Sequence, residues 1–329
     1  MNVSQIINDL SGIKVVVIGD VMLDTYYWGK VDRISPEAPV PIVALDKKEV
    51  RIGGAGNVAL NTVSLGASTF VFSVVGDDVQ GKELKELMQA SNINTDNIIP
   101  SSERITTNKT RIISRNQHMM RLDEEVATDI NEGLENELVA QFEKFVSTHQ
   151  PHVVILEDYN KGVLTTNVIA RIIAICKQKN IITTIDPKRK NFFAYKGATI
   201  FKPNLKEVKE ALNLLFDDIN IDLLENIHLQ LKAELDHGFS LITLSEHGMF
   251  YAGNEQTRII PSHLRNIADV SGAGDTVIAV ASLVYAASKN IDLAAAVANI
   301  AGGLVCEEVG TVAINKGKLL KECKSLLAE

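Results

Sequence analysis

The sequence predicts an α/β protein with a doubly wound, mostly parallel sheet and helices on both faces. Short runs rich in β-branched residues end in polar side chains, as buried parallel strands do: Lys14 to Asp20, Phe70 to Asp78, Val153 to Tyr159, Ile181 to Lys188 and Leu241 to Gly248. Stretches with apolar residues at helical spacing lie between them: Glu132 to Thr148, Thr165 to Lys179 and Ile221 to Asp236. Alternating strands and helices are typical of a parallel sheet covered by helices.

Two segments interrupt this alternation and predict a small β lid that projects from the main sheet. They span about residues 21–46, with YYWGKV and PEAPVPIVALD, and about residues 106–122, TTNKTRIISRNQHMMRL. Both have extended character, and the prolines of the first suit an edge strand. Surface hairpins without a function are the alternative. We therefore expect one domain, residues 1–329, that contains both lid segments.

Composition excludes several functional classes. The net charge of −8 argues against general nucleic-acid binding, which normally requires a basic face. Cys176, Cys306 and Cys323 form no closely spaced pair, so neither a disulfide framework nor a zinc site is predicted, and a reducing cytoplasm fits best. The chain starts without a secretory signal, and no apolar stretch reaches the ~20 residues that cross a bilayer, so no membrane association is expected.

Polar residues at the strand ends indicate where a ligand would bind. Asp20, Asp158, Asp186 and Ser245 each lie at or just after the end of a predicted strand. In doubly wound sheets, ligands bind beyond the carboxyl ends of the strands. We expect these side chains to share one rim.

The stretch DVSGAGDT (269–276) precedes an apolar run with helical spacing. Its small residues let a phosphate approach the backbone N–H groups of Gly272, Ala273 and Gly274, where the helix dipole adds positive charge. A carboxylate would repel a resting phosphate, so Asp275 is explained if it takes a proton from a hydroxyl that attacks that phosphate. Complementing the helix dipole is the alternative. A catalytic Asp275 should face a cleft.

A second glycine cluster, RIGGAGNVALNTVSLGA (51–67), also opens a predicted helix. Gly53 and Gly54 allow close backbone approach, and the Asn57 amide both donates and accepts hydrogen bonds, as a sugar hydroxyl requires. A glycine turn needed for packing is the alternative. Neither a P-loop nor a G-x-G-x-x-G turn occurs, so phosphate chemistry here must use another architecture.

Together, GGAGNVALNTVSLGA and DVSGAGDT resemble the paired signatures of the ribokinase-like (PfkB) carbohydrate kinases, over nearly the whole chain. The resemblance implies ATP and Mg²⁺ as cofactors. It implies that Asn204 and Glu207, in KPNLKEVKEAL, help place magnesium and the nucleotide phosphates, with Glu207 acting on the metal indirectly. A helix capping box is the alternative for this pair.

Other positions receive roles from the same resemblance. LSEHGM resembles the nucleotide-side turn, which implies Ser245 and Gly248, and Asn299 falls where the family contacts adenine. Asp269 would lie near a monovalent cation such as K⁺. LSEHG is less glycine-rich than the usual family turn, so nucleotide preference stays open.

A narrower resemblance comes from RISPEAPVP, TTNKTRIISRNQHMMRLDEE, EDYNKGVL and DPKRKNFFAYKGA. These segments closely resemble the D-glycero-β-D-manno-heptose 7-phosphate kinases. This implies transfer of the γ-phosphate of ATP to the anomeric (C1) hydroxyl of the heptose, giving the 1,7-bisphosphate, in the biosynthesis of ADP-heptose for lipopolysaccharide. No H-x-G-H motif of a nucleotidylyltransferase occurs, so we expect a kinase alone and a separate adenylylating protein.

A phosphorylated sugar requires cations, and these recur along the second lid segment. Alternate residues of a strand share a face, so Lys109, Arg111 and Arg115 could meet one ligand, while a solvated basic edge is the alternative for Arg115 and for Arg121. Lys188, followed by Arg189 and Lys190, is a second candidate phosphate patch, and a solvated turn is its alternative.

The remaining sugar contacts follow from the resemblance. It implies that ring hydroxyls bind to residues of the first strand end, the first glycine cluster and the rim: Asp20, Asp24, Gly53, Gly54, Asn57 and Asp158. Another PfkB-type kinase, such as a ribokinase or fructokinase, and a non-catalytic sugar-binding regulator are the competing functions. Apolar lid strands indicate a homodimer through the lid.

Overall fold

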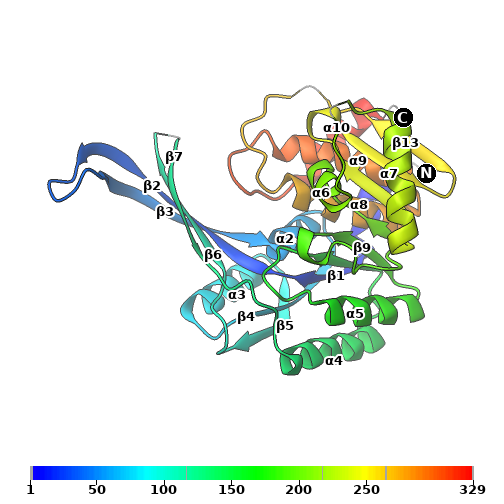
Figure 1. Cartoon of the computed structure of the whole chain (residues 1–329), viewed down its shortest axis with the longest axis horizontal. Helices are drawn as coiled ribbons and strands as arrows, with labels where there is room; N and C mark the ends of the chain where they lie inside the picture. Colours follow the sequence, from blue (N-terminus) through cyan, green and yellow to red (C-terminus); the bar gives the residue numbers. More distant parts are fainter. Residues whose placement is uncertain (1–2, 116, 217, 264, 328–329) are drawn as a thin grey trace.

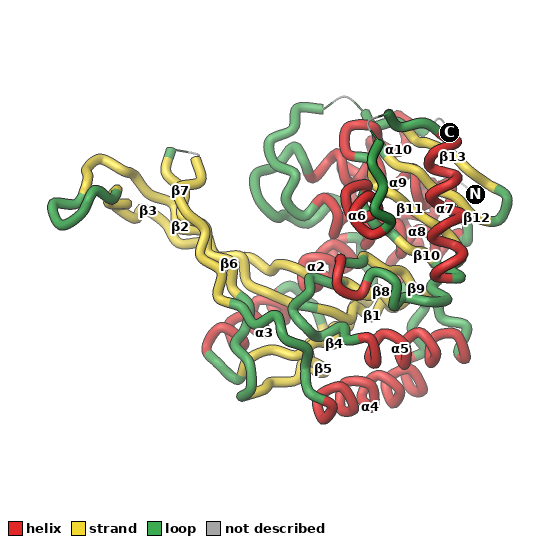
Figure 2. Tube along the Cα trace, in the orientation of Figure 1, coloured by secondary structure: helices red, strands yellow, loops and turns green. Residues whose placement is uncertain are grey.

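The computed structural model describes residues 3–115, 117–216, 218–263 and 265–327. Within these residues the strands form one sheet of nine strands and one of four (Figures 1 and 2). In spatial order the large sheet contains β13 (Gln256–Ile260), β12 (Met249–Gly253), β11 (Phe239–Thr243), β10 (Ile200–Phe201), β9 (Ile182–Asp186), β8 (Val153–Glu157), β1 (Lys14–Gly19), β4 (Ser68–Gly76) and β5 (Asn94–Ser101). Pairing is parallel except where β12 meets β11 and β13, which confirms the predicted fold class.

Helices cover both faces of this sheet. On one face lie α1 (Val3–Asp9), α2 (Ala55–Ser64), α3 (Val79–Ala90), α8 (Ala273–Ser288), α9 (Ile291–Val305) and α10 (Lys316–Leu326). On the other lie α4 (Glu132–His149), α5 (Thr166–Gln178), α6 (Leu205–Ala211) and α7 (Ile221–Leu235). Val15 and Val17 of β1 pack into the first core and Val16 and Ile18 into the second, because side chains alternate along a strand. No helix among the described residues is long and apolar enough to span a bilayer.

The three predicted helical stretches correspond to α4, α5 and α7 to within two residues. Asn131, Thr165 and Asn220 cap these helices, each accepting a hydrogen bond from a backbone N–H in the first turn. Strands β5, β10, β12 and β13 were not predicted. β10 has two residues, and half of β5 is polar, so neither shows a continuous apolar run.

The four-stranded sheet projects from the body as a long arm (Figure 1). Its order is β3 (Pro41–Gly54), β2 (Val21–Ile34), β6 (Asn108–Ser114) and β7 (Gln117–Glu124). Both predicted lid segments lie here, although β3 continues past residue 46 to Gly54, and residue 116 lies outside the described residues. Pro41 begins β3, an edge strand, as its missing N–H requires.

The chain reverses direction across the large sheet between β1 and β8. From β1 it adds β4 and β5 on one side, and β8 then pairs with β1 on the other side, followed by β9 and β10. Such a switch point leaves a crevice at the carboxyl ends of the two central strands. Asp20 follows β1 and Asp158 follows β8, so both lie at this crevice.

Glu157, the last residue of β8, is a carboxyl group inside the core. It is 0% exposed, and neither oxygen has a hydrogen-bond partner among the described residues. Burial, together with the negative charges of Asp186 and Asp275, raises the pKa of Glu157 well above its ordinary value. Burial therefore favours the protonated form of Glu157 in the folded chain.

We expect Glu157→Gln to change how stability depends on pH. The folded state keeps a proton that the unfolded chain releases above the ordinary pKa of 4.5, so the free energy of unfolding falls as pH rises beyond that value. Glutamine cannot ionise. The free energy of unfolding of Glu157→Gln minus that of the wild type should therefore increase between pH 5 and pH 8, by at most about 1.4 kcal/mol per pH unit. Urea unfolding at both pH values measures this.

Glu225→Gln, on the exposed side of α7, is the matched control and should follow the wild type. A Glu157→Gln variant whose stability runs parallel to that of the wild type at every pH would show that Glu157 is ionised in the fold.

Candidate active site

A cavity of about 440 Å³ opens beside the carboxyl ends of β8, β9 and β11 and the N-terminus of α8. Its lining comprises Tyr159, Asp186, Lys188, Lys202, Asn204, Leu205, Lys206, Thr243, Ser245, Val270, Gly272, Gly274 and Asp275. The fold thus brings residues between Tyr159 and Asp275 to one rim, and these include Asp186 and Ser245 of the four predicted strand-end residues. The rim includes six residues that the sequence analysis singled out for catalysis or for binding phosphate and nucleotide.

The N-terminus of α8 forms part of the cavity wall. Gly272 is its N-cap with φ of 78°, and a Cβ there would lie 2.9 Å from Asn57 Nδ2, so glycine is required on both counts. No described residue accepts a hydrogen bond from the N–H of Gly272 or Gly274. The N–H of Ala273 donates to the Val270 carbonyl at 3.3 Å, so in this state two of the three predicted N–H groups are available to an anion.

Asp275 is 5% exposed yet lines the cavity, so its carboxylate faces a cleft as a base must. Asn57 Nδ2 donates to one oxygen and the Tyr159 hydroxyl to the other, both at 2.7 Å. Burial raises the pKa of Asp275 to about 6, against the lowering effect of these two hydrogen bonds. A carboxylate in this state is ionised at neutral pH and still basic enough to accept a proton.

Asp186 anchors two lysines at the cavity wall. Its oxygens lie 3.3 Å from Lys188 Nζ and 2.8 Å from Lys202 Nζ. Burial alone would raise the pKa of Asp186, but the two ammonium groups hold its pKa below the ordinary value. Lys188 also contacts Glu207 at 2.9 Å, so predicted phosphate and metal residues form one charged network.

Asn204 and Glu207 form a helix capping box, which was the alternative interpretation of this pair. Asn204 accepts from the Glu207 N–H and Glu207 accepts from the Asn204 N–H, both at 2.8 Å, which completes a capping box at the start of α6. The free Glu207 oxygen contacts Lys188 at the cavity wall. The box therefore fixes the carboxylate where it can act on bound ligands.

The base of the lid carries the predicted sugar contacts. Asp24 on β2 forms an ion pair with Arg111 on β6, and its neighbour Gly53 on β3 has no room for a Cβ, which would lie 2.4 Å from Asp24 Oδ2. Gly54 has φ of 60°, and a Cβ there would lie 2.4 Å from the Asp20 carbonyl. These contacts keep β2, β3 and the start of α2 close to Asn57 and Asp275.

Lys109 stands beside Asp24 on the same face of the lid, because the two residues pair across β2 and β6. Unlike the Arg111 guanidinium, the ammonium group of Lys109 forms no ion pair or hydrogen bond with another described residue. Its Nζ lies 5.2 Å from the Tyr159 ring centroid. Burial lowers the pKa of Lys109, while the Asp24 charge acts in the opposite sense. It is a half-buried ammonium group without a counter-ion at contact distance.

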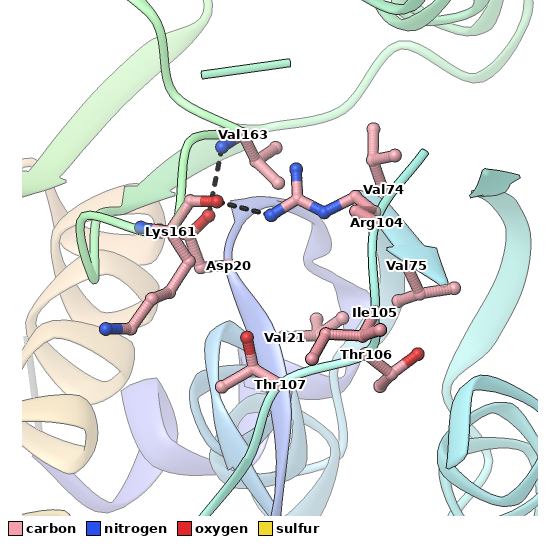
Figure 3. Close-up of a pocket in the computed structure, with 10 residues that line it drawn as sticks. All are labelled: Asp20, Val21, Val74, Val75, Arg104, Ile105, Thr106, Thr107, Lys161 and Val163. Atoms are coloured by element: carbon pink, nitrogen blue, oxygen red, sulfur yellow. Dashed lines mark hydrogen bonds between the residues drawn. The ribbon is translucent and has the colours of Figure 1, made fainter. Parts of the chain in front are cut away.

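Asp20 and Asp158, which are predicted to bind sugar, both accept hydrogen bonds from neighbouring groups of the chain. The Asp20 carboxylate accepts hydrogen bonds from three backbone N–H groups, those of Tyr159, Lys161 and Val163. Figure 3 shows the hydrogen bond from Val163 to Asp20. Asp158 accepts from the Tyr195 hydroxyl at 2.8 Å and the Asn160 N–H at 2.7 Å. Both residues are 1% exposed, and neither lines the 440 Å³ cavity beside α8. They shape the loop after β8 instead.

Several peripheral predictions also need correction. Arg115 follows β6 in a turn with φ of 49° and contacts Asp32 at 3.5 Å, so it leaves the strand face of Lys109 and Arg111. Arg121 pairs with Asp123 on the exposed strand β7. Lys190 contacts Asp129, away from Lys188. A strand pattern alone could not show where the strand ends.

Of the predicted nucleotide residues, Ser245 lines the cavity. Gly248 has φ of 91° and closes the tight turn between β11 and β12, where a Cβ would lie 2.1 Å from the Ile260 carbonyl. Asn299 on α9 donates to the Pro261 carbonyl at 2.8 Å. Neither Gly248 nor Asn299 contributes to the cavity lining, so the predicted adenine contact has no support from this cavity.

Metal-binding capacity in the described residues is limited. No group of three or more His, Cys, Asp or Glu side chains there is arranged to hold a metal ion. Asp269 accepts hydrogen bonds from Ser271 and from the Gly310 N–H, which hold its pKa below the ordinary value although burial would raise it. Magnesium in kinase sites usually combines one or two carboxylates with substrate phosphates. Asp186 lines the cavity, and Glu207 lies behind Lys188, so Asp186 could hold the metal and Glu207 could act on it indirectly.

Two residues of this site were missed by the sequence analysis. Lys202 follows the two-residue strand β10 and is 2% exposed, and the signal was its place two residues before Asn204 of the N-x-x-E element. Tyr159 lay inside a quoted motif without a role. Its contact with Asp275 joins residues 116 positions apart, which no local pattern reveals.

Comparison with known proteins agrees with this geometry. The family described as pfkB family carbohydrate kinase matches residues 13–316. The bifunctional protein HldE of Aliarcobacter butzleri is 41% identical over 298 residues, and that of Campylobacter curvus is 39% identical over 307. These alignments cover 91% and 93% of this chain but 62% and 64% of the relatives, so the chain spans less than two thirds of their length.

Solved structures share the fold. Phosphofructokinase-2 from Escherichia coli, in its tetrameric inhibited form, superimposes with a TM-score of 0.79 at 14% identity, covering 96% of this chain and all of the other. Ribokinase of Arabidopsis thaliana, complexed with ribose and ATP, gives 0.72 at 16% identity, over 94% and 99% of the chains. With a family match over residues 13–316, this chain belongs to the pfkB family of carbohydrate kinases, which are phosphotransferases.

Proposed function

We propose that this chain transfers the γ-phosphate of ATP to the anomeric hydroxyl of D-glycero-β-D-manno-heptose 7-phosphate. The substrate assignment rests on Lys109, a half-buried ammonium group beside the sugar-binding face with no anionic partner at contact distance. Burying an unpaired cation is costly unless a ligand neutralises it, and a phosphate on the sugar would do so. The heptose kinase motifs and the HldE relatives support the same acceptor.

The proposed mechanism uses Asp275 as the base. The anomeric O–H proton passes to Asp275, the freed oxygen attacks the γ-phosphorus, and the bond to ADP breaks. The N–H groups of Gly272 and Gly274 at the positive end of α8, together with Lys188 and Lys202, face the charge on the transferring group. Bound magnesium would add charge neutralisation on the phosphates, with Asp186 holding the metal and Glu207 acting on it indirectly.

Further parts of the proposal concern the surroundings of the reaction. The lid would cover the sugar and exclude water that could otherwise hydrolyse ATP. ATP as the donor suits a cytoplasmic reaction. A monovalent cation such as K⁺ would lie near Asp269, whose oxygens accept three hydrogen bonds and keep a further acceptor position.

A coupled ADP-release screen over phosphorylated and unphosphorylated sugars tests the acceptor. We expect heptose 7-phosphate to give the highest kcat/KM. A higher value with ribose or fructose would assign another member of the family, and absence of ADP release with every sugar would favour a non-catalytic regulator.

The pH profile tests the base. Asp275 accepts a proton only when ionised, so kcat/KM should be lost as pH falls through the pKa of about 6 that burial produces. Asp275→Asn should lower kcat roughly 10²- to 10⁴-fold with little change in KM for ATP. Steady-state kinetics between pH 5 and pH 9 measure both effects.

Two controls complete this experiment. The acceptor's phosphate also titrates near pH 6, and the residual activity of Asp275→Asn isolates that contribution. Asp222→Asn removes an exposed first-turn carboxylate of α7 and tests helix-dipole complementation alone. An Asp275→Asn variant with wild-type turnover would exclude this residue as the base.

Lys109→Ala tests the sugar phosphate contact. Loss of a charge-assisted hydrogen bond should raise KM for heptose 7-phosphate roughly 10- to 100-fold, while an unphosphorylated acceptor should be barely affected. Lys48→Ala is the matched control, since Lys48 pairs with Tyr27 and lies on the opposite face of the lid. Equal effects of Lys109→Ala on both acceptors would contradict a phosphate-binding role.

We also propose a homodimer through the lid. Met120 and Leu122 on β7 are 56% and 49% exposed, and both lie on the face away from Lys109. A partner covering this face would remove them from water. Sedimentation equilibrium should give twice the chain mass, and Met120→Glu with Leu122→Glu should give the single chain mass. A wild-type monomer at micromolar concentration would contradict the dimer.

A further inference from the structure

Tyr159 contacts the proposed base directly. Its hydroxyl donates to one oxygen of Asp275 at 2.7 Å, while Asn57 Nδ2 holds the other oxygen. A carboxylate offers about four lone-pair positions, so these two donors fix its orientation and still leave room for an acceptor hydroxyl. The carboxylate therefore has one defined position before any sugar binds.

The backbone of Tyr159 is held from the opposite side. Its N–H and that of Lys161 donate to the same oxygen of buried Asp20, at 2.9 and 3.0 Å, and Val163 donates to the other. Three hydrogen bonds to one buried carboxylate restrict the loop after β8 at its first residues. The tyrosine is thus anchored to the end of β1.

Two ammonium groups flank the Tyr159 ring. Lys109 Nζ lies 5.2 Å and Lys188 Nζ 5.5 Å from the ring centroid, within the range of cation–π attraction. Lys109 comes from the lid and Lys188 from the loop after β9. The ring therefore stands between the proposed sugar phosphate contact and the lysine of the phosphate-side network.

The hydroxyl group can act here only as a donor. Burial and the Asp275 charge raise the pKa of Tyr159 well above its ordinary value, so the phenol keeps its proton. A donor to an ionised carboxylate favours the ionised form. Other groups facing Asp275 partly cancel: the charge of Asp186 on β9 raises the pKa of Asp275 and Lys188 lowers it, while burial favours the uncharged form of Glu157 on β8.

We propose that Tyr159 is a positioning residue for phosphoryl transfer, whose hydroxyl fixes Asp275 in the ionised, proton-accepting state. The inference rests on the proposed role of Asp275 as the base, and it holds for any acceptor sugar. During transfer the acceptor O–H bond breaks and its proton binds Asp275, the acceptor oxygen bonds to the γ-phosphorus, and the bond to ADP breaks. Tyr159 gains and loses no atom in this step.

Tyr159→Phe tests the proposal through the pH profile. Without the hydroxyl, the acidic limb of kcat/KM should move up by about one pH unit, because a hydrogen bond to a charged group is lost. We expect kcat at pH 7 to fall roughly tenfold and to recover in part at pH 9, with KM for both substrates changing less than threefold. An unmoved limb would overturn the proposal, and a rise in KM alone would make Tyr159 a substrate ligand instead.

Tyr195→Phe is the matched control. Tyr195 is also a buried tyrosine whose hydroxyl donates to a buried carboxylate, that of Asp158, at 2.8 Å. Its removal should cost comparable stability in thermal unfolding but leave the acidic limb in place. Equal limb shifts in the two variants would show a general structural effect and overturn the proposal.

A second substitution keeps the test independent of folding. Site-specific 3-fluorotyrosine at position 159 retains the hydroxyl and makes it a stronger donor, so the limb should move to lower pH, opposite to Tyr159→Phe. No shift, or a shift in the same direction, would overturn the proposal. The ADP-release screen with the wild type shows separately whether heptose 7-phosphate is the acceptor. If it is not, the pH profiles of kcat/KM are measured with the sugar that the screen identifies.

Discussion

The ion pairs of Asp186 with Lys188 and Lys202 are the interaction on which the site depends. Three carboxyl groups, Glu157, Asp186 and Asp275, lie in a region from which water is nearly excluded. The two lysines hold the pKa of Asp186 below its ordinary value, and burial favours the protonated form of Glu157. At Asp275 burial raises the pKa, while the hydrogen bonds from Asn57 and Tyr159 and the charge of Lys188 lower it.

The same network links the two proposed halves of the reaction. Lys188 contacts Glu207 on the nucleotide side and lies near the Tyr159 ring, which reaches Asp275 on the sugar side. A bound phosphate would compete with Asp186 and Glu207 for these lysines. The charge around Asp275 is therefore expected to depend on whether nucleotide is bound, a direct consequence of ion pairs shared between subsites.

Asp20 joins the lid to the catalytic rim. Strand β1 passes through Asp20 directly into β2, and the Ala55 N–H at the start of α2 returns to the Asp20 carbonyl at 3.0 Å. Asp20 thus holds the start of the lid through its main chain and the loop that carries Tyr159 through its side chain. This explains a buried carboxylate at the switch point that does not touch the cavity.

How far the sequence could predict this protein depended on the range of each interaction. The strand and helix pattern, the glycine turn before α8 and the rim of polar strand ends are local features, and these were predicted. Asp275 and Gly272 both lie within the eight-residue motif DVSGAGDT, so their proximity could be predicted from the sequence. In contrast, the sequence places Asp20 and Asp158 at strand ends but does not show which groups donate hydrogen bonds to their carboxylates. In the structure these donors come from elsewhere in the chain.

By itself, then, the sequence determined the α/β architecture, the lid segments and the candidate base, because periodicity and short motifs involve residues close together in the sequence. Only the tertiary structure decided which charges remain available. Arg111 is neutralised by Asp24 while Lys109 is not, and Tyr159 in the loop after β8 reaches Asp275 at the start of α8. The physical reason is that burial and charge pairing arise from segments distant in sequence, and their effects on each carboxylate and ammonium group have no local signature.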